Sequence, residues 1–410
     1  NILNYFVYIH MANVYNKRKT RKKHSRIKLT KKKRKQTKKT KKNHHIIDKT
    51  PHINKELRNS IAKGGKYSPS INKYLKSLKT LSPTGAQGCK KDDIYTKELS
   101  VGRHCHKWDS KEAREIMLRN LVSKKPIDCN TVTAPKQLLS NCWFNAFFMT
   151  FFISDRGRKF NRWLREAMIT GIMANHKPVP KKLQRPFFLL NKYIDASLRA
   201  PYNKTDFASL MNTNNIIKDI HAAIGKDVNI NHTLVAKVDV PSNPFSFYSG
   251  LYNYLGYDLM RWSKIVVQSG SFDKDWLGKK VTSRAIQDGT PMEPKMPKVI
   301  FLEIFDSESK EFNKPIDFFV YFTKYGEKIK YKYSLDSAIL RNTEQFHFSA
   351  YLTCNGKEFS FDGESFSRMN PFKWKSKLNK NTAWKTSKED VEFNFQKGYQ
   401  LLVYYIEQVE

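Results

Sequence analysis

The chain has 410 residues, of which 40% are hydrophobic and 13% aromatic, and its formal net charge is +38. This length and apolar content exclude a chain that is disordered throughout, and they allow one large domain or two smaller ones. No stretch reaches the roughly 20 apolar residues of a membrane-spanning helix, so we expect a soluble protein without a membrane partner.

The first part of the chain, residues 1–69, is predicted to be a disordered basic tail and linker. Its short apolar start lacks the features of a secretory signal, and Met11 is expected to be the true first residue. Residues 17–42 hold 17 Lys or Arg, and no acidic residue precedes Asp48. Such a block repels itself and cannot bury apolar surface, so we expect it to bind nucleic acid or an acidic partner, or to direct nuclear import. The alternative is a solubilising tail without a specific partner.

The cysteines follow no regular spacing. They are Cys89, Cys105, Cys129, Cys142 and Cys354. An odd number of irregularly spaced cysteines argues against a disulfide framework and favours a reducing, intracellular compartment. The run His104-Cys105-His106 invites comparison with a zinc site, but the chain has no CxxC pair, and three consecutive residues are poorly arranged around one tetrahedral ion. We therefore interpret these side chains as structural thiols and surface histidines, and we expect no metal.

Two helices are predicted after the tail. The first covers residues 70–81. The second covers residues 109–126, with Asp109 or Ser110 as its cap and acidic side chains in its first turn. Together with their connections they form a helical N-terminal segment, residues 70–136.

The next helix begins with a cysteine, in the stretch QLLSNCWFNAFFMTFF at residues 137–152. Asn141 is a good helix cap, which puts Cys142 in the first turn, and nine of the eleven residues 143–153 are apolar, so this helix is predicted to be buried. A thiol at the positive end of a helix dipole is favoured as the thiolate nucleophile. The Gln137 amide can help to hold an oxyanion beside it. The alternative, equally open from this stretch alone, is that Cys142 is one more small buried side chain.

A further helix is predicted at residues 158–171, with Gly171 at its end. Residues 172–295 mix helical and irregular pieces with proline-rich breaks, and the sequence does not divide them.

From about residue 297 the pattern changes to strands. They are predicted at residues 298–305, 316–322, 327–335, 346–353, 357–362 and 399–407. Helices followed by an antiparallel sheet indicate an α+β fold. The order resembles that of a papain-like cysteine peptidase, in which a buried helix bearing Cys packs on a sheet bearing His and Asp. The chain has no phosphate-binding glycine loop, and we expect no cofactor.

Residues 346–365, FHFSAYLTCNGKEFSFDGES, are predicted to form a β-hairpin. Asn355-Gly356 is the preferred two-residue type I′ turn, and it fixes the register so that Cys354 faces Lys357.

Alternation along the two strands then divides the hairpin into two faces. The apolar face must lie against the core, and it carries Phe346, Phe348, Ala350, Leu352, Phe359, Phe361 and Gly363. The polar face carries His347 and Asp362 as diagonal neighbours, a relation of ~7–8 Å that is within side-chain reach. A carboxylate there can hold the imidazole in one tautomer. Glu364, opposite His347, is the alternative carboxylate, and a solvated polar face without a catalytic role is the alternative for both.

Two of these stretches resemble the ubiquitin-specific proteases, a papain-like family of deubiquitinating enzymes. SNCWFNAFFMTFF, residues 140–152, is similar to their Cys box. Residues 333–365, from YSLDSAILRN to SFDGES, are similar to their His box, and YQLLVYYIE, residues 399–407, to their closing strand. The resemblance implies a Cys142 nucleophile, a His347 base and an orienting Asp362, with an isopeptide bond at a ubiquitin-like carboxyl terminus as substrate.

The sequence departs from the family pattern at several positions. Gln137 stands where the family usually has Asn, Phe346 replaces the Gly before the His, and Gly363 replaces a second Asp. The CxxC zinc pairs of the family's fingers are absent, so residues 172–295 are expected to be a reduced or different substrate-binding region.

The sequence thus favours a peptidase domain over residues 137–410 with thiol-dependent isopeptidase or peptidase activity. A composition rich in Lys, Asn, Ile, Phe and Tyr also resembles that of proteins from large cytoplasmic DNA viruses, which suggests the host cytoplasm, the nucleus or a virion as location. The alternative function is a virion structural or nucleic-acid-binding protein that keeps a peptidase-like fold and uses residues 17–42 to hold nucleic acid or an acidic capsid partner.

Overall fold

The computed structural model of the chain describes residues 98–101, 104–173, 177–199, 211–224, 242–255, 262–267, 273–291, 293–305, 313–324, 327–342, 347–366, 368–386 and 391–408. The predicted basic tail, the helix predicted at residues 70–81 and Cys89 lie outside the described residues. All described residues belong to one compact unit, Thr50–Glu410.

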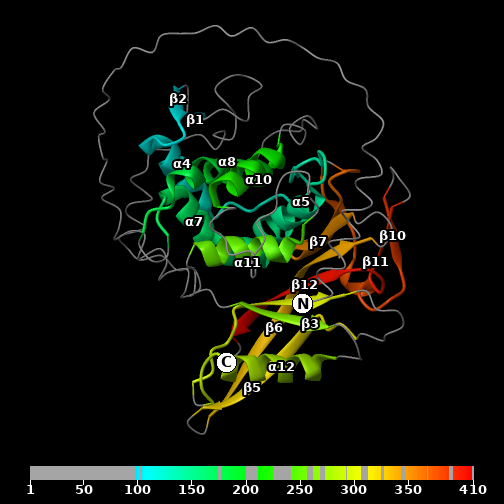
Figure 1. Cartoon of the computed structure of the whole chain (residues 1–410). Helices are drawn as coiled ribbons and strands as arrows, with labels where there is room; N and C mark the ends of the chain where they lie inside the picture. The colour runs from blue at the N-terminus through cyan, green and yellow to red at the C-terminus, as the bar shows by residue number, and fades with distance from the viewer. Residues whose placement is uncertain are drawn as a thin grey trace. The chain divides into compact units, whose positions relative to one another are not determined.

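One large sheet organises this unit (Figure 1). Its strands follow the order β3-β4-β12-β6-β7-β8-β9, and β5 pairs with the first half of β6. The bounds are β3 Trp262–Val267, β4 Val299–Ile304, β5 Asp317–Lys324, β6 Glu327–Arg341, β7 Phe348–Cys354, β8 Lys357–Phe361, β9 Asn370–Pro371 and β12 Gln400–Gln408. Two short hairpins do not belong to this sheet: β1 Glu98–Val101 with β2 His104–Lys107, next to α4, and β10 Ala383–Lys385 with β11 Glu392–Asn394.

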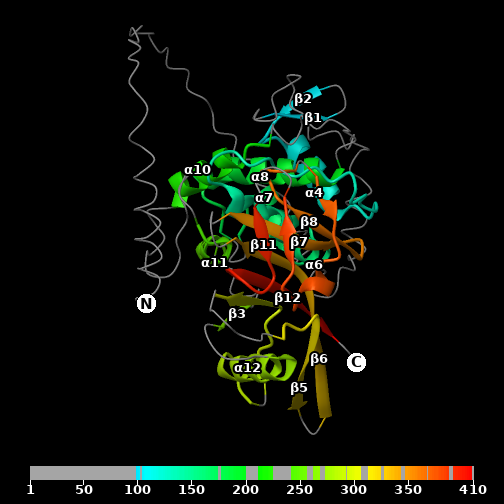
Figure 2. The same cartoon turned by 90° about the vertical axis from the view of Figure 1, so that its right-hand side faces the viewer.

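Helices cover both faces of the sheet, most of them on one face (Figure 2). That face receives α4 Lys111–Val122, α5 Cys142–Phe148, the π-helical turn η1 Met149–Ile153, α6 Asp155–Phe160, α7 Arg162–Thr170, α8 Lys181–Arg199, α10 Thr213–Ile224 and α11 Pro244–Tyr254. The other face receives α12 Lys274–Gln287 and the β10–β11 hairpin. Along β12, Leu401 and Val403 enter the first core while Leu402 and Tyr404 enter the second, because successive side chains of a strand point to opposite faces. A membrane-spanning helix is not found among the described residues.

Each of the six predicted strands is present, and β6 is longer than predicted because it continues to Arg341. The expectation of a wholly antiparallel sheet is wrong in one place, since β3 runs parallel to β4. Strand β3 lies within residues 172–295, which the sequence did not divide into elements. It is followed by the crossover helix α12 that a parallel pair of strands requires.

The cysteine-bearing helix is buried as predicted. Every residue from Trp143 to Ile153 is buried, and the helix changes from α to π geometry at Met149. The helix predicted at residues 158–171 is divided into α6 and α7, and Gly171 ends α7 in the left-handed conformation with φ 72°.

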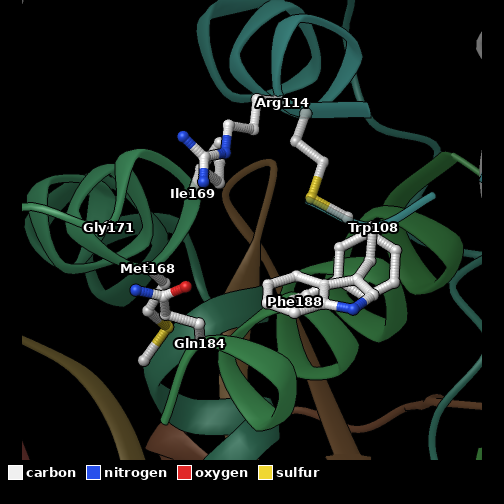
Figure 3. A pocket seen from close by; sticks show the side chains of 8 residues that line it. Trp108, Arg114, Met168, Ile169, Gly171, Gln184 and Phe188 are labelled. Atoms are coloured by element: carbon white, nitrogen blue, oxygen red, sulfur yellow. The ribbon is translucent and has the colours of Figure 1, made fainter. Parts of the chain in front are cut away.

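A small hollow lies between α4, α7 and α8 (Figure 3). It is lined by Trp108, Arg114, Met117, Met168, Ile169, Gly171, Gln184 and Phe188. Its volume of about 20 Å³ is close to the space that one water molecule needs, so it is too small to hold a substrate.

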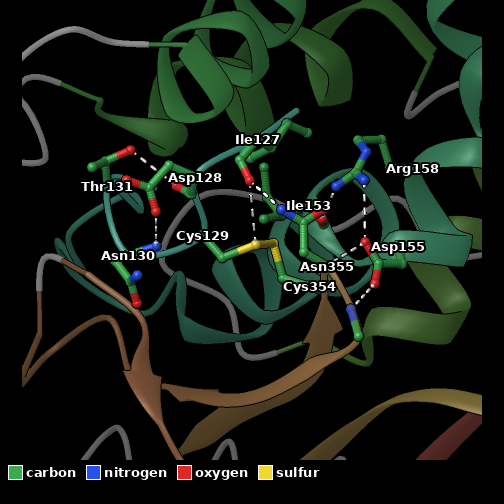
Figure 4. The surroundings of a disulfide bond; sticks show 11 residues. Ile127, Asp128, Cys129, Asn130, Thr131, Ile153, Asp155, Arg158, Cys354 and Asn355 are labelled. Carbon is green, nitrogen blue, oxygen red and sulfur yellow. Dashed lines mark hydrogen bonds and ion pairs between the residues drawn. A yellow bond between two sulfur atoms is a disulfide. The ribbon is translucent and has the colours of Figure 1, made fainter. Parts of the chain in front are cut away.

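The expectation that the cysteines are separate structural thiols is wrong for two of them, because Cys129 and Cys354 form a disulfide (Figure 4). They lie 225 residues apart in the chain, so their spacing gave no sign of it. The fold brings them together because the tip of the β7–β8 hairpin docks beside α6. There Asp155 accepts hydrogen bonds from the backbone N–H groups of Asn355 and Gly356, at 2.9 and 3.0 Å.

Removing this disulfide is expected to lower the stability of the folded chain. Because it closes a very long loop, replacing Cys129 and Cys354 together by Ala should lower the free energy of unfolding by about 2–4 kcal/mol. Urea denaturation of the two proteins measures the difference. Equal stability of the double variant and the wild type would mean that the two sulfurs are not bonded in solution.

Candidate active site

The proposed nucleophile, Cys142, is the first residue of α5. It is half-buried, and it is unbonded, unlike Cys129 and Cys354. Because Cys142 is the first residue of α5, its thiol lies at the positive end of the helix dipole, and α5 packs against β7.

The predicted capping role of Asn141 is only partly right. Asn141 occupies the cap position, but its side chain makes no capping hydrogen bond to the helix. Instead its Oδ1 accepts from the N–H of Leu138 at 3.1 Å, and its Nδ2 donates to the hydroxyl of Thr213 at 2.8 Å. The side chain therefore fixes the loop before the thiol rather than the helix itself.

His347 and Asp362 lie where the hairpin register puts them. The observed pairs Cys354–Lys357 and Leu352–Phe359 are those of the predicted turn, in which Asn355 and Gly356 have φ 49° and 71°. His347 Nε2 and Asp362 Oδ1 are 2.6 Å apart. Asp362 leaves the other ring nitrogen, Nδ1, unused, and Cys142 is close enough to the imidazole to raise its pKa.

Glu364, the alternative carboxylate, lies farther from the ring. Its Oε2 is 3.9 Å from His347 Nε2, and its side chain is 36% exposed, whereas that of Asp362 is 1% exposed. The backbone N–H of Glu364 also donates to Asp362 Oδ1 at 3.1 Å, which helps to hold that carboxylate in place. Asp362 is therefore the close partner of the imidazole.

The charges in the site depend on one another. Burial alone would lower the pKa of His347, but the hydrogen bonds that its ring donates to Asp362 and Cys142, together with the charges of these two groups, raise it from 6.5 to about 10. Burial alone would raise the pKa of Asp362, but its contact with the imidazolium lowers it. The arrangement favours a charged imidazole beside the thiol.

The polar face of the hairpin is not solvated, in contrast to the alternative considered from the sequence. His347, Ser349, Tyr351, Ser360 and Asp362 are all buried. The β10–β11 hairpin covers them, with the Phe393 ring 5.7 Å from the His347 ring. An aromatic cover of this kind excludes water and strengthens the interaction between His347 and Asp362.

Gln137, the fourth predicted site residue, lies in the loop that leads to Cys142. Its backbone N–H donates to the carbonyl of Gly363 at 2.7 Å, and its side-chain Oε1 is buried without a hydrogen-bond partner. A Cβ at Gly363 would meet Asn145 Nδ2 at 3.1 Å and the carbonyl of Pro135 at 3.3 Å. The absence of a side chain at Gly363 thus lets the loop before the thiol approach the segment after Asp362.

A buried polar network anchors this loop, and sequence reasoning missed it. The Thr213 hydroxyl, at the start of α10, donates to Asn145 Oδ1 at 2.8 Å and accepts from Asn141. Its neighbour Asn214 donates to the carbonyl of Leu138 at 2.6 Å. The spacing of Asn141 and Asn145 places both on one helical face, but nothing local links them to a threonine about 70 residues later.

Among the described residues, no cluster of His, Cys, Asp or Glu could hold a metal ion.

Thr213 offers a matched pair of substitutions. Thr213→Val keeps the shape but leaves buried groups of Asn141 and Asn145 without a partner, so the free energy of unfolding should fall by roughly 2 kcal/mol or more. Thr213→Ser keeps the hydroxyl and should cost about 1 kcal/mol or less. Urea denaturation compares them, and a valine variant as stable as the serine variant would contradict the network.

Neither a protein-family model nor a curated protein matches the chain. Among solved structures it is similar to a chain of the SAGA Ubp8/Sgf11/Sus1/Sgf73 DUB module bound to ubiquitin aldehyde, with 11% identity, 69% of this chain and 71% of that chain covered, and a TM-score of 0.41. The same module bound to monoubiquitin gives 11% identity, coverage of 73% and 76%, and a TM-score of 0.41. A yeast SAGA DUB module with a variant Sgf73 gives 12% identity, coverage of 70% for both chains, and a TM-score of 0.34. A likeness at this level does not establish the family to which the chain belongs.

Proposed function

We propose that the chain is a thiol-dependent peptidase in which Cys142, His347 and Asp362 act together. One observation carries the proposal. The half-buried thiol of Cys142, at the start of a buried helix, lies beside the imidazole of His347, whose Nε2 is hydrogen-bonded to the buried carboxylate of Asp362. A nucleophile, a base and an orienting group in this order form the arrangement that covalent catalysis requires.

In the proposed reaction the Cys142 thiolate attacks the carbonyl carbon of the substrate, and a C–S bond forms. The oxyanion is held by backbone N–H groups at the start of α5 and by the Gln137 amide. The His347 imidazolium gives its proton to the leaving amine, the C–N bond breaks, and a thioester remains. Water then attacks the thioester while His347 takes its proton, which releases the acid and restores the thiolate. Asp362 holds the ring and stabilises its charge through both steps.

The substrate we propose is the carboxyl terminus of ubiquitin or of a ubiquitin-like protein, joined to an amine by an amide or isopeptide bond. This part rests on the resemblance of residues 140–152 and 333–365 to the Cys and His boxes of ubiquitin-specific proteases. The alternative, a nucleic-acid-binding or structural protein, depends on residues 17–42, which lie outside the described residues. A thiol peptidase is the function that the site geometry favours.

The experiment is covalent labelling of the full chain by a ubiquitin probe with an electrophile at its carboxyl terminus, followed by intact mass. We expect one probe to attach at Cys142. Asp362→Asn should slow the labelling by roughly 10²-fold or more, because the charged imidazole and its working tautomer lose their partner. Glu364→Gln should slow it by less than about fivefold, as expected for a partly exposed charge.

Cys142→Ser and His347→Ala are the negative controls, and thermal melts check that each variant is folded. Absence of labelling in a folded wild-type chain would contradict a ubiquitin-like substrate. A larger loss from Glu364→Gln than from Asp362→Asn would exchange the roles of the two carboxylates.

A further inference from the structure

The ladder between β6 and β7 ends one residue before it reaches His347. Its last pair is Arg341 with Phe348, and the next pair in the same register would be Asn342 with His347. One bond of that pair is present, since the N–H of Asn342 donates to the carbonyl of His347 at 3.0 Å. In a regular antiparallel pair of this kind, the N–H of His347 would donate in return to the backbone carbonyl of Asn342.

The side chain of Asn342 supplies the second bond instead. The N–H of His347 donates to Asn342 Oδ1 at 2.9 Å. Both residues are buried, so water cannot readily replace this bond. A short side chain with an oxygen acceptor, as in Asn or Asp, is suited to bonding a nearby backbone N–H in this way. The backbone of His347 is therefore held at its N–H and at its carbonyl by one residue, beyond the end of the regular ladder.

The position of the His347 backbone decides where the imidazole lies. The side chain leaves from the Cα between the bonded N–H and the bonded carbonyl, and the ring then reaches Asp362 Oδ1 at 2.6 Å. The titratable groups that face the ring are Cys142 of α5 and, after β8, Asp362 and Glu364, while β11 contributes the uncharged ring of Phe393. Because a displacement of about 1 Å at a reacting group can cost roughly 10²-fold in rate, the bond to Asn342 bears directly on the chemistry.

We propose that Asn342 is a positioning residue, whose Oδ1 holds the backbone of His347 so that the imidazole meets both Cys142 and Asp362. The proposal rests on the proposed thiol-peptidase function, and it adds to that site a residue that acts through the base. A substitution at Asn342 tests the side chain by itself, because the backbone N–H that donates to His347 is kept in each variant below.

The test compares three variants in the full chain. Asn342→Leu keeps the approximate shape and removes the acceptor, so labelling of Cys142 by the ubiquitin probe should slow by roughly 10²-fold. Asn342→Gln keeps the amide but moves it by one methylene, and it should slow the labelling by about tenfold or more. Asn342→Asp keeps the length and the acceptor, and should stay within about threefold of the wild type, since a carboxylate also accepts from a backbone N–H.

Titration of the His347 ring, followed by NMR with ring-labelled histidine, separates positioning from loss of stability. A ring that no longer meets Asp362 loses the partner that raises its pKa. The titration should therefore move to lower pH by about one unit or more in Asn342→Leu, and it should not move to lower pH in Asn342→Asp.

Asn161→Leu is the matched control. Asn161 is also buried, and its Nδ2 donates to the carbonyls of Phe151 and Gly157 at 2.9 and 3.0 Å. Its replacement should lower the melting temperature because buried bonds are lost, but the labelling rate of the folded protein and the titration of His347 should match those of the wild type.

Three results would overturn the proposal: wild-type labelling in folded Asn342→Leu, slower labelling without a shift in the titration of His347, or equal losses in Asn342→Leu and Asn342→Asp. If Asn342→Leu does not fold, Asn342→Gln and Asn342→Asp decide by the same criteria. A titration that moves to lower pH in Asn342→Leu, together with a wild type that the ubiquitin probe does not label, would refute the ubiquitin-like substrate and leave the role of Asn342 intact.

Discussion

The hydrogen bond between His347 and Asp362 is the constraint on which the site depends. Both side chains are buried, and a buried charge is costly unless it is paired. The pair therefore requires a sheet covered on both faces, with α5 against one side of the β7–β8 hairpin and the aromatic side chains of β10–β11 against the other. The short β10–β11 hairpin, late in the chain, supplies the dry surroundings in which the pair is strong.

A second constraint acts on the loop that precedes Cys142, among the helices on one face of the sheet. Cys142 is useful only if the loop before it has one conformation, and four hydrogen-bonded neighbours determine that conformation: Asn141, Asn145, Thr213 and Asn214. The contact between Gln137 and Gly363 then joins this loop to the segment that follows Asp362. The nucleophile and the carboxylate are thus linked by backbone as well as through the imidazole, and the disulfide at the hairpin tip joins the same two parts of the chain a second time.

How much of this the sequence could predict depends on how local the cause is. The Asn355-Gly356 turn fixes the register of the hairpin from two adjacent residues, and the shared face of His347 and Asp362 follows from it. The burial of the cysteine helix follows likewise from its own apolar residues. The aromatic cover over the polar face of the β7–β8 hairpin cannot be predicted from local sequence, because Phe393 lies 46 positions after His347, in a three-residue strand. Cys129 and Cys354, and likewise Asn141 and Thr213, lie even farther apart in sequence, and only the packed fold brings these residues together.

The charge of His347 is the most direct measure of the central claim, and NMR of ring-labelled histidines can follow it in the full chain. Of the 11 histidines, the signal of His347 is the one that disappears in His347→Gln. A pKa raised from 6.5 to about 10 means that the pairing stabilises the fold fully below pH 6.5, and that this stabilisation is lost as the pH rises through about 10. The ring should therefore remain protonated well above pH 8 in the wild type, and Asp362→Asn should move its titration to lower pH. Titration of His347 near pH 6.5 in the wild type, unchanged by Asp362→Asn, would contradict the account.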